Sequence, residues 1–468
     1  MTMFDSKPHR YPATFWCFTF GFLLNNCAFS VLMQLQSSIN PYLGSISISF
    51  SHVSSMLVCL FVQPILFKTT SPRFQFAISS FGYLAFALAN FYPVWYVMLP
   101  AAVCLGFATG IAWSSATYFV TVLATDHDFA SDDLFSVFTG VVQFSSIAGN
   151  LAAVGIVKKF LQDPSTLELD AQEFTQLIDG GGAAEIDVNI EQCVSHNPIA
   201  GHGSSHRVLS KEGIMVLSGG CALITVLAIL LLFFGLGGRY ASRLDKTSKP
   251  GLKTIVHSLK GMIKQSKNRN QLLIAPMTIY SATVLCFIMS DITRHVITPC
   301  MGVGAVPFLM ITYGIGISSG CFLTSHLLRI FAVKSLMIVA GSLDAICFCF
   351  LFYWRGVNSL PISIVLCIGL GFTAGIFESG MPSIYAKLFP ETSEAAFAWW
   401  NTLFNIGAIF IFGWSSFFSL HLKLLILLLL LALSLASLYQ VDFEAAEKQR
   451  KTVQNSKQEE ILGQVDAP

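Results

Sequence analysis

The chain has too few charged residues for a soluble protein of its size. Of its 468 residues, 11% are Asp, Glu, Lys or Arg, whereas 54% are hydrophobic. Soluble domains carry about 25% charged residues, so polar groups cannot cover a globular surface here. The formal net charge is +1, so the chain also lacks the basic excess that is typical of nucleic-acid binders. These shortages predict an all-α polytopic membrane protein and exclude secreted disulfide scaffolds and nucleic-acid binding.

Long apolar runs fill most of the chain. A helix needs roughly 20 mostly apolar residues to cross a bilayer, and twelve runs satisfy this. Within them Asp344 and Glu378 are the only charged residues, and no Lys or Arg is included. The predicted spans are 15–34, 46–67, 74–92, 95–121, 135–157, 213–236, 271–290, 304–328, 335–354, 360–381, 396–419 and 424–440.

The distribution of Lys and Arg predicts the orientation of the chain. Most basic residues fall on one side when the N-terminus is placed in the cytosol, and positive charge favours the cytosolic side. We therefore expect cytosolic termini in a multi-pass protein of the plasma membrane, with an endomembrane as the alternative. The first apolar run is as long as a full span, so we expect it to stay in the membrane rather than to be cleaved as a signal peptide.

Shifts in composition divide the chain into two halves and three polar segments. The predicted divisions are a cytosolic N-terminus (1–14), an N-terminal six-helix half (15–236) with an outward loop (158–212), a basic cytosolic linker (237–270), a C-terminal six-helix half (271–440) and a disordered cytosolic tail (441–468).

The basic linker contains apolar residues at helical spacing. Lys253, Lys260, Lys264 and Lys267 lie among them. This pattern predicts an amphipathic helix on the inner membrane surface, in contact with membrane lipids. A solvated linker with accidental periodicity is the alternative.

Spans four and ten carry similar sequences. Residues 106–114 read GFATGIAWS and residues 371–379 read GFTAGIFES, with five identities in nine. Both spans are fourth in a set of six, which suggests duplicated halves of the major facilitator type. In each, a Gly-x-x-x-Gly pair, Gly106 with Gly110 and Gly371 with Gly375, is expected to let helix backbones pack closely.

Several short segments resemble the Unc-ninety-three family, a branch of the major facilitator superfamily, and in particular its homolog A group. Their order and spacing carry the resemblance more than any one of them. They are LQSS at 35–38, LGFATGIAWS at 105–114, QFSSIAGN at 143–150, LF at 388–389, EAAFA at 394–398, KLLIL at 423–427 and DFE at 442–444.

This resemblance implies twelve spans, cytosolic termini and a regulatory role. One nematode member of the family is associated with a two-pore potassium channel in muscle. A mammalian relative escorts Toll-like receptors out of the endoplasmic reticulum. We therefore expect the partner to be another membrane protein, a potassium channel or a receptor.

The connection between spans two and three differs from that of ordinary transporters of this superfamily. Their loop carries a Gly, an Asp and several Arg and helps to close the inner gate. Residues 68–73 read KTTSPR here, without the Gly or the Asp. The difference favours a protein that does not transport, although other latches exist.

Two acids inside predicted spans are candidate functional residues, because a charge at the bilayer centre costs about 2.5–3.5 kcal/mol on insertion scales. Asp344 lies in span nine, which is peripheral in this architecture, and could meet a partner's helix; the alternative is bonding to Ser342 and neighbouring hydroxyls. Glu378 lies in span ten and could bind a cation or a proton in a central cavity. The alternative for Glu378 is an interfacial acid paired with Lys387 or a linker residue.

Amide side chains inside spans form a further set. They could line a polar cavity for a small molecule or an ion, or they could bond neighbouring helices at around 0.6 kcal/mol per hydrogen bond. The six candidates are Asn25, Asn26, Gln143, Asn150, Asn401 and Asn405.

Two pairs are expected on the outer side. Asp291 and Arg294, after span seven, could form an outer gate, with a local surface ion pair as the alternative. Cys193 in the outward loop and Cys300 could form a disulfide between the halves, because oxidising surroundings permit it. The other cysteines are expected to behave as small apolar residues.

No catalytic, metal or cofactor motif stands in a suitable context. Residues 316–320 read GISSG, but they lie within an apolar span rather than at a strand-to-helix turn. We therefore expect a non-enzyme without a cofactor. The resemblance implies an accessory protein of a potassium channel or another membrane protein. A secondary transporter of a small solute and a trafficking chaperone for receptors are the alternatives.

Overall fold

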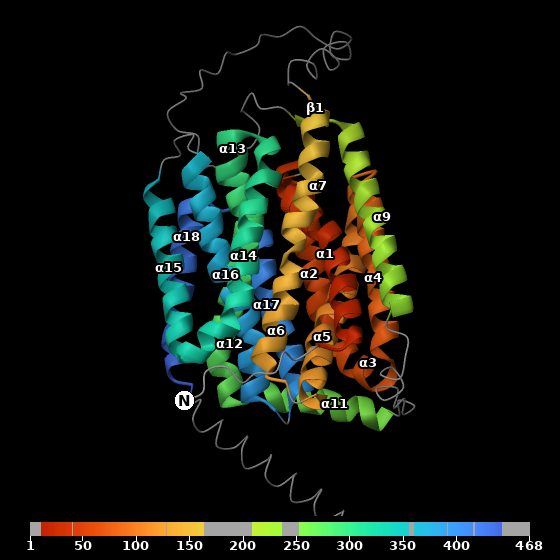
Figure 1. The fold of residues 1–468 in the computed structure, drawn as a ribbon, viewed down its shortest axis with the longest axis vertical. Helices are drawn as coiled ribbons and strands as arrows, with labels where there is room; N and C mark the ends of the chain where they lie inside the picture. Colours follow the sequence, from red (N-terminus) through yellow and green to blue (C-terminus); the bar gives the residue numbers. More distant parts are fainter. Residues whose placement is uncertain are drawn as a thin grey trace, which may run out of the picture.

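The protein is a bundle of long helices that run along a common axis (Figure 1). The computed structural model describes residues 11–39, 41–127, 129–162, 208–235, 252–354, 360–390, 392–414 and 417–441. In the N-terminal half the helices are α1 (Ala13–Ile39), α2 (Pro41–Leu57), the π-helical η1 (Val58–Val62), α3 (Gln63–Thr69), α4 (Pro72–Ala89), α5 (Trp95–Asp126), α6 (Ser131–Gln143), α7 (Ser145–Phe160) and α9 (Lys211–Gly235).

The C-terminal half follows a short helix, α11 (Leu252–Ser266), which lies crosswise at one end of the bundle (Figure 1). At the opposite end the strands β1 (Leu161–Gln162) and β2 (Val208–Leu209) pair antiparallel. We call these the α11 end and the β1 end. The remaining elements are α12 (Arg269–Phe287), the π-helical η3 (Ile288–Ile297), α13 (Thr298–Met301), the 3-10 helix η4 (Val303–Ala305), α14 (Val306–Ile330), α15 (Val333–Tyr353), α16 (Leu360–Leu388), α17 (Ser393–Trp414) and α18 (Leu420–Tyr439).

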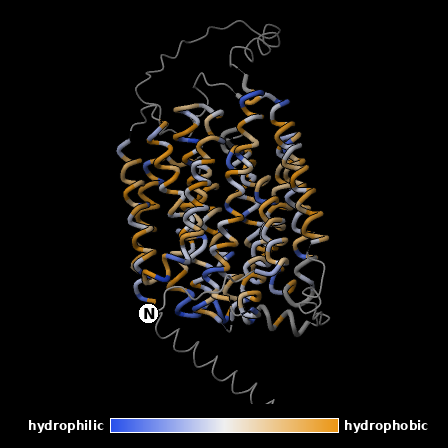
Figure 2. Tube along the Cα trace, viewed as in Figure 1, coloured by the Kyte–Doolittle hydropathy of each residue, from blue (hydrophilic) through white to orange (hydrophobic). Residues whose placement is uncertain are grey.

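The spans predicted from the sequence are present as helices. Within the described residues, eleven segments are long and apolar enough to cross a membrane, and the shorter apolar helix Phe74–Ala89 occupies the remaining predicted position. Apolar residues cover most of the helix lengths and hydrophilic residues gather mainly toward the ends (Figure 2). Helices suit such a sequence because lipid offers no hydrogen bonds to the backbone. The expected fold is therefore confirmed.

Several spans are longer than predicted, and two of the extensions with charged residues bear on the site. The seventh runs from Arg269 to Met301 over 33 residues, whereas the apolar run ends at Ser290. α16 continues to Leu388, seven residues past the predicted end. In both places the sequence prediction ended the span too early, because it accepted only apolar residues. The charged side chains there have partners inside the protein or at its edge.

The Gly-x-x-x-Gly pairs pack two helix crossings, one in each half. A Cβ at Gly106 would overlap the carbonyl oxygen of Ser51 in α2, and a Cβ at Gly375 would overlap that of Ile317 in α14. Close contact is similar at Gly110 and Gly371. The prediction of close backbone packing is thus confirmed for α5 on α2 and for α16 on α14.

A cysteine marks the same point of both crossings. Cys59 Sγ lies 3.8 Å from the carbonyl oxygen of Gly110, and Cys321 Sγ lies 3.4 Å from that of Gly375. Equivalent helices of the two halves thus place a thiol on the second glycine of the repeated motif. This correspondence supports the internal duplication independently of the sequence match.

Candidate functional site

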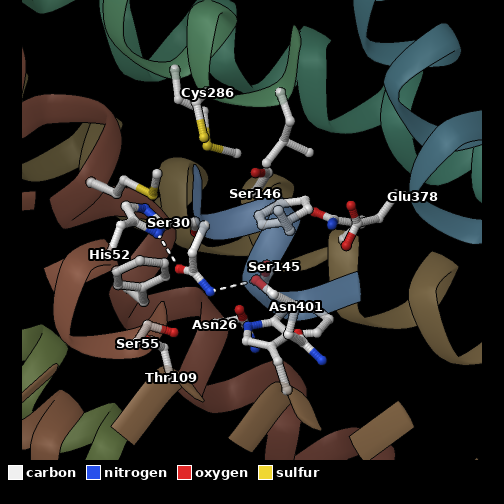
Figure 3. A pocket seen from close by; sticks show the side chains of 18 of the residues that line it. Asn26, Ser30, His52, Ser55, Thr109, Ser145, Ser146, Cys286, Glu378 and Asn401 are labelled. Atoms are coloured by element: carbon white, nitrogen blue, oxygen red, sulfur yellow. Dashed lines mark hydrogen bonds between the residues drawn. The ribbon is translucent and has the colours of Figure 1, made fainter. Parts of the chain in front are cut away.

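A cavity lies between the two halves, with walls from both. Its volume is about 90 Å³, which is far below the roughly 300–1,000 Å³ of most ligand pockets. Figure 3 shows its polar side chains converging from helices of the two halves. The N-terminal half contributes Asn26, Phe29, Ser30, Met33, His52, Ser55, Thr109, Trp113, Gln143, Ser145 and Ser146, and the C-terminal half contributes Leu285, Cys286, Met289, Glu378, Trp400, Asn401, Phe404 and Asn405.

Glu378 is the only acid among these lining residues. It is 7% exposed, and in Figure 3 its carboxylate points from α16 toward the other labelled side chains. Among the described residues it has no hydrogen-bond partner and no basic residue within ion-pair distance. The cavity therefore contains one carboxyl group with no counter-charge among its described neighbours.

The interfacial alternative for Glu378 is wrong. α16 continues for ten residues beyond it, so Glu378 is far from the helix end. Lys387 Nζ instead lies 2.5 Å from Asp132 Oδ2. Glu378 is thus part of the cavity, as the repeat of spans four and ten suggested.

The six candidate amides divide between the two roles. Four of them, Asn26, Gln143, Asn401 and Asn405, line the cavity. Asn25 and Asn150 do not: Asn25 Nδ2 donates to Ser80 Oγ at 2.7 Å, and Asn150 Nδ2 donates to Gln34 Oε1 at 2.6 Å. For this pair, the interpretation as bonds between helices is the one that the geometry supports.

His52 is a lining residue that the sequence analysis missed. Its Nδ1 lies 2.8 Å from Asn405 Oδ1, and its ring stacks on Phe412 with centroids 5.8 Å apart. Asn405 Nδ2 donates to the carbonyl oxygen of Asn401 at 2.7 Å. These contacts connect α2 to α17 and hence one half to the other. The sequence feature that could have identified His52 is a titratable side chain inside an apolar span.

Asp344 does not face a partner. It is fully buried, and its carboxylate accepts hydrogen bonds from Tyr280 Oη at 2.8 Å and from Thr373 Oγ1. Ser342 instead donates to the carbonyl oxygen of Ile338 at 2.8 Å. The prediction of an exposed contact is therefore wrong. Hydroxyls do bond Asp344, as the alternative predicted, but they belong to the neighbouring helices α12 and α16 rather than to its own helix α15.

We predict that Asp344→Leu lowers the free energy of unfolding by about 1–3 kcal/mol, because it leaves the buried Tyr280 hydroxyl without an acceptor. Thermal unfolding of the detergent-purified chain measures this effect. Ser342→Ala is the control, since that exposed hydroxyl bonds only within its own helix turn. Normal stability of Asp344→Leu together with loss of a co-purifying partner would return Asp344 to the role of a contact residue.

Asp291 belongs to a buried cluster of charged groups rather than to the surface. Lys423 Nζ lies 2.6 Å from Asp291 Oδ1 and 3.2 Å from His295 Nε2, and the Lys423 and Asp291 side chains have no exposed area. Arg294 is buried as well, and its guanidinium lies 6.0 Å from the Tyr42 ring of the other half. The prediction of a surface ion pair is wrong. The sequence analysis had placed Lys423 just outside span twelve, whereas α18 includes it.

Ion pairs join the halves at the α11 end. Arg329 Nη2 lies 2.7 Å from both carboxylate oxygens of Asp133, and Lys387 pairs with Asp132. One turn further along α6, Ser136 Oγ lies 3.0 Å from Ser379 Oγ. These contacts hold α6 of the N-terminal half against α14 and α16 of the C-terminal half.

The basic helix α11 is attached to the bundle along one side. Trp399 Nε1 donates to the Met262 carbonyl oxygen at 2.8 Å, and Thr392 Oγ1 donates to Gln265 Oε1 at 3.0 Å. Lys260, Lys264 and Lys267 are exposed, together with Val256 and Ile263. The helix is present as predicted; its place on a membrane surface stays a prediction. The side chain of Lys253 lies outside the described ones.

Cys300 is disulfide-bonded. Cys193 lies outside the described residues, so the pairing of these two cysteines stays a prediction. Ten other cysteines are free thiols, most of them buried or half-buried in helices.

Comparison with known proteins identifies a family over most of the chain. The family model described as "Ion channel regulatory protein UNC-93" matches residues 35–439. "Protein unc-93 homolog A" of Danio rerio is 25% identical over 439 residues, which cover 91% of this chain and 90% of that protein. "Putative potassium channel regulatory protein unc-93" of Caenorhabditis elegans is 20% identical over 393 residues, covering 81% of this chain and 53% of that protein.

A likeness among solved structures concerns the fold alone. The fucose:proton symporter FucP of E. coli superposes with a TM-score of 0.59 at 12% identity, covering 92% of this chain and 99% of that structure. The helical bundle is thus of the major facilitator type, and the match of the family model covers far more than half of the sequence. The chain belongs to the UNC-93 family.

Proposed function

We propose that this protein is a regulatory subunit of another membrane protein, with a potassium channel as the first candidate partner. The observation that carries the proposal is the match of residues 35–439 to a family described as ion channel regulatory. The name of the nematode relative supports a potassium channel in particular. A chaperone that delivers membrane receptors is a related alternative within the same class.

Two structural features favour regulation over transport of large solutes. The cavity, at about 90 Å³, is far smaller than most ligand pockets, which argues against a large solute in this conformation. The turn between α3 and α4 is held within its own half, because Gln75 Nε2 donates to the carbonyl oxygens of Leu66 and Thr70. The loop also lacks the Gly and the Asp of the latch that closes the inner gate of ordinary transporters, and this difference favours regulation.

Co-expression with individual potassium channels tests the regulatory role. Whole-cell current and the amount of channel at the cell surface are measured together, with FucP as a control of the same fold. For a true partner we expect the current per surface channel to change about fivefold or more, within the usual range of coupling between sites. A change in surface amount alone would support the delivery role. No change in either quantity for any channel would contradict the proposal.

A secondary transporter of a small solute is the second candidate, and the position of Glu378 favours it. The residue lies in a cavity between two halves that ion pairs join at the α11 end. Opening of those pairs would expose the cavity to one side of the membrane and closure would protect it, as alternating access requires.

We expect Glu378→Gln to abolish solute uptake into proteoliposomes while leaving surface expression unchanged. The reason is that the cavity then loses its only carboxylate. Glu212→Gln, at an exposed acid in the first turn of α9, is the control and should transport normally. Full uptake by the Glu378 variant would remove this residue from the mechanism.

A further inference from the structure

We propose that the central cavity binds a small protonated amine, whose N–H groups donate to Glu378 on one side and to His52 on the other. This inference rests on the second candidate function only in assuming that the cavity accepts a ligand. It adds the chemical class of that ligand, and it holds whether the ligand is transported or only sensed.

The charge of the lining selects a cation. Glu378 has no basic neighbour among the described residues, and the lining contains no Lys or Arg. A carboxylate in a membrane interior is costly unless it is neutralised or paired. A positively charged ligand would supply the missing partner, whereas an anion would be repelled.

The hydrogen bonds of His52 select a ligand that carries N–H donors. Asn405 Nδ2 donates to the backbone of α17, which fixes its Oδ1 toward His52 Nδ1. Nδ1 must then carry the hydrogen of the neutral ring, and Nε2 keeps a lone pair. Nε2 is buried and has no partner among the described residues. Because Nε2 has almost no accessible area in this conformation, the ring must turn toward the cavity before an ammonium N–H can donate to it; a quaternary ammonium has no N–H to donate.

The aromatic residues of the lining and the volume of the cavity restrict the chemical class of the ligand further. Trp113, Trp400, Phe29 and Phe404 line the cavity, and the faces of such rings attract cations. The indole Nε1 of Trp400 also has no partner among the described residues; an oxygen on the ligand could accept from it if the indole turned toward the cavity. A volume of about 90 Å³ suits a compact molecule with an ammonium group and a hydroxyl, of which ethanolamine is a simple example.

Binding would hold the two halves together. Glu378 belongs to α16 of the C-terminal half and His52 to α2 of the N-terminal half, and Figure 3 shows them on opposite sides of the cavity. A ligand that bridges them stabilises this conformation over any in which the halves have separated, because it binds only the closed arrangement tightly. Binding of the amine would thus shift the bundle toward this conformation.

Thermal unfolding of the purified full chain, with ethanolamine as the probe, tests the inference. We expect the unfolding temperature to rise with ethanolamine concentration, and to rise less with tetramethylammonium, which has no N–H. In Glu378→Gln and in His52→Phe the affinity should fall about tenfold or more, since each loses a charge-assisted hydrogen bond. Glu212→Gln should respond as the unaltered chain does.

Two results would overturn the inference. One is an unfolding temperature that rises with KCl or NaCl but not with ethanolamine, which would assign the cavity to an inorganic ion. The other is an ethanolamine response that survives in Glu378→Gln, provided that this variant unfolds at the normal temperature without ligand. Binding without uptake would leave the inference standing and count against transport. Uptake of another solute without amine binding would support transport and contradict the inference.

Discussion

Lys423→Met is expected to lower the free energy of unfolding by about 3–5 kcal/mol, the usual cost of breaking a buried ion pair. Its ammonium group lies 2.6 Å from Asp291 Oδ1 with both side chains fully buried. Removing Lys423 takes the ion-pair partner at 2.6 Å away from the buried Asp291 carboxylate, and a buried charge is costly when its pairing is weakened. The yield of folded protein and its thermal unfolding temperature in detergent measure the loss.

The matched controls for Lys423→Met separate charge from packing. Neutralising both partners, in Lys423→Met with Asp291→Asn, should recover part of the stability, because the charge that faced Lys423 is removed as well. Lys387→Met breaks a partly exposed ion pair at the α11 end and should cost less than about 1 kcal/mol. A single Lys423 variant as stable as the unaltered chain would mean that the pair is not formed in the membrane protein.

Gly375→Leu is expected to disrupt the crossing of α16 on α14. Any Cβ at this position would overlap the Ile317 carbonyl oxygen, and a backbone atom cannot turn aside as a side chain can. Overpacking in well-packed cores costs about 1–3 kcal/mol and occasionally more, so the variant should lie at the upper end or fail to accumulate. Fluorescence size-exclusion profiles and thermal unfolding measure this outcome.

Gly220→Leu is the control for the glycine crossing. A Cβ at Gly220 would meet no other atom within 4 Å, so the larger side chain has open space. We expect a stability equal to or slightly above that of the unaltered chain, since leucine favours a helix more than glycine does. Equal behaviour of the two glycine variants would contradict the close packing of the repeated motif.

The helical architecture was predictable from composition because a lipid environment restricts the choice of backbone structure. Long apolar runs must be helical in a bilayer, and these runs are long enough to be counted. The repeat of Gly106 and Gly110 at Gly371 and Gly375 was also readable, because identical residues recurred at the same ordinal span. The crossings they pack were then found in the same place in both halves.

The acids inside spans were identified, but their surroundings were not. Asp344 and Glu378 were selected because a charge in a bilayer is expensive. Which helix faces each of them depends on the packing of the bundle, and a single sequence carries no information on contacts between distant segments. For that reason both acids were left with two alternatives, and only the packing shows that hydroxyls of other helices bond Asp344 and that Glu378 lines the cavity.

The buried charge cluster was missed for a different physical reason. The rule that ended span seven at Ser290 treats Asp291 as too polar for a membrane, and the same rule started span twelve after Lys423. Each residue is expensive alone, but together with His295 they satisfy one another. A search for opposite charges at the edges of two adjacent spans would have been the signal to use.

Purification from native membranes in mild detergent, followed by mass spectrometry of the proteins that co-elute, tests the regulatory function most directly. The proposal predicts that a potassium channel or another membrane protein co-elutes in fixed proportion, and that Asp344→Asn does not change its recovery. A chain that elutes alone under conditions that preserve known channel complexes would contradict the regulatory function and favour the transporter.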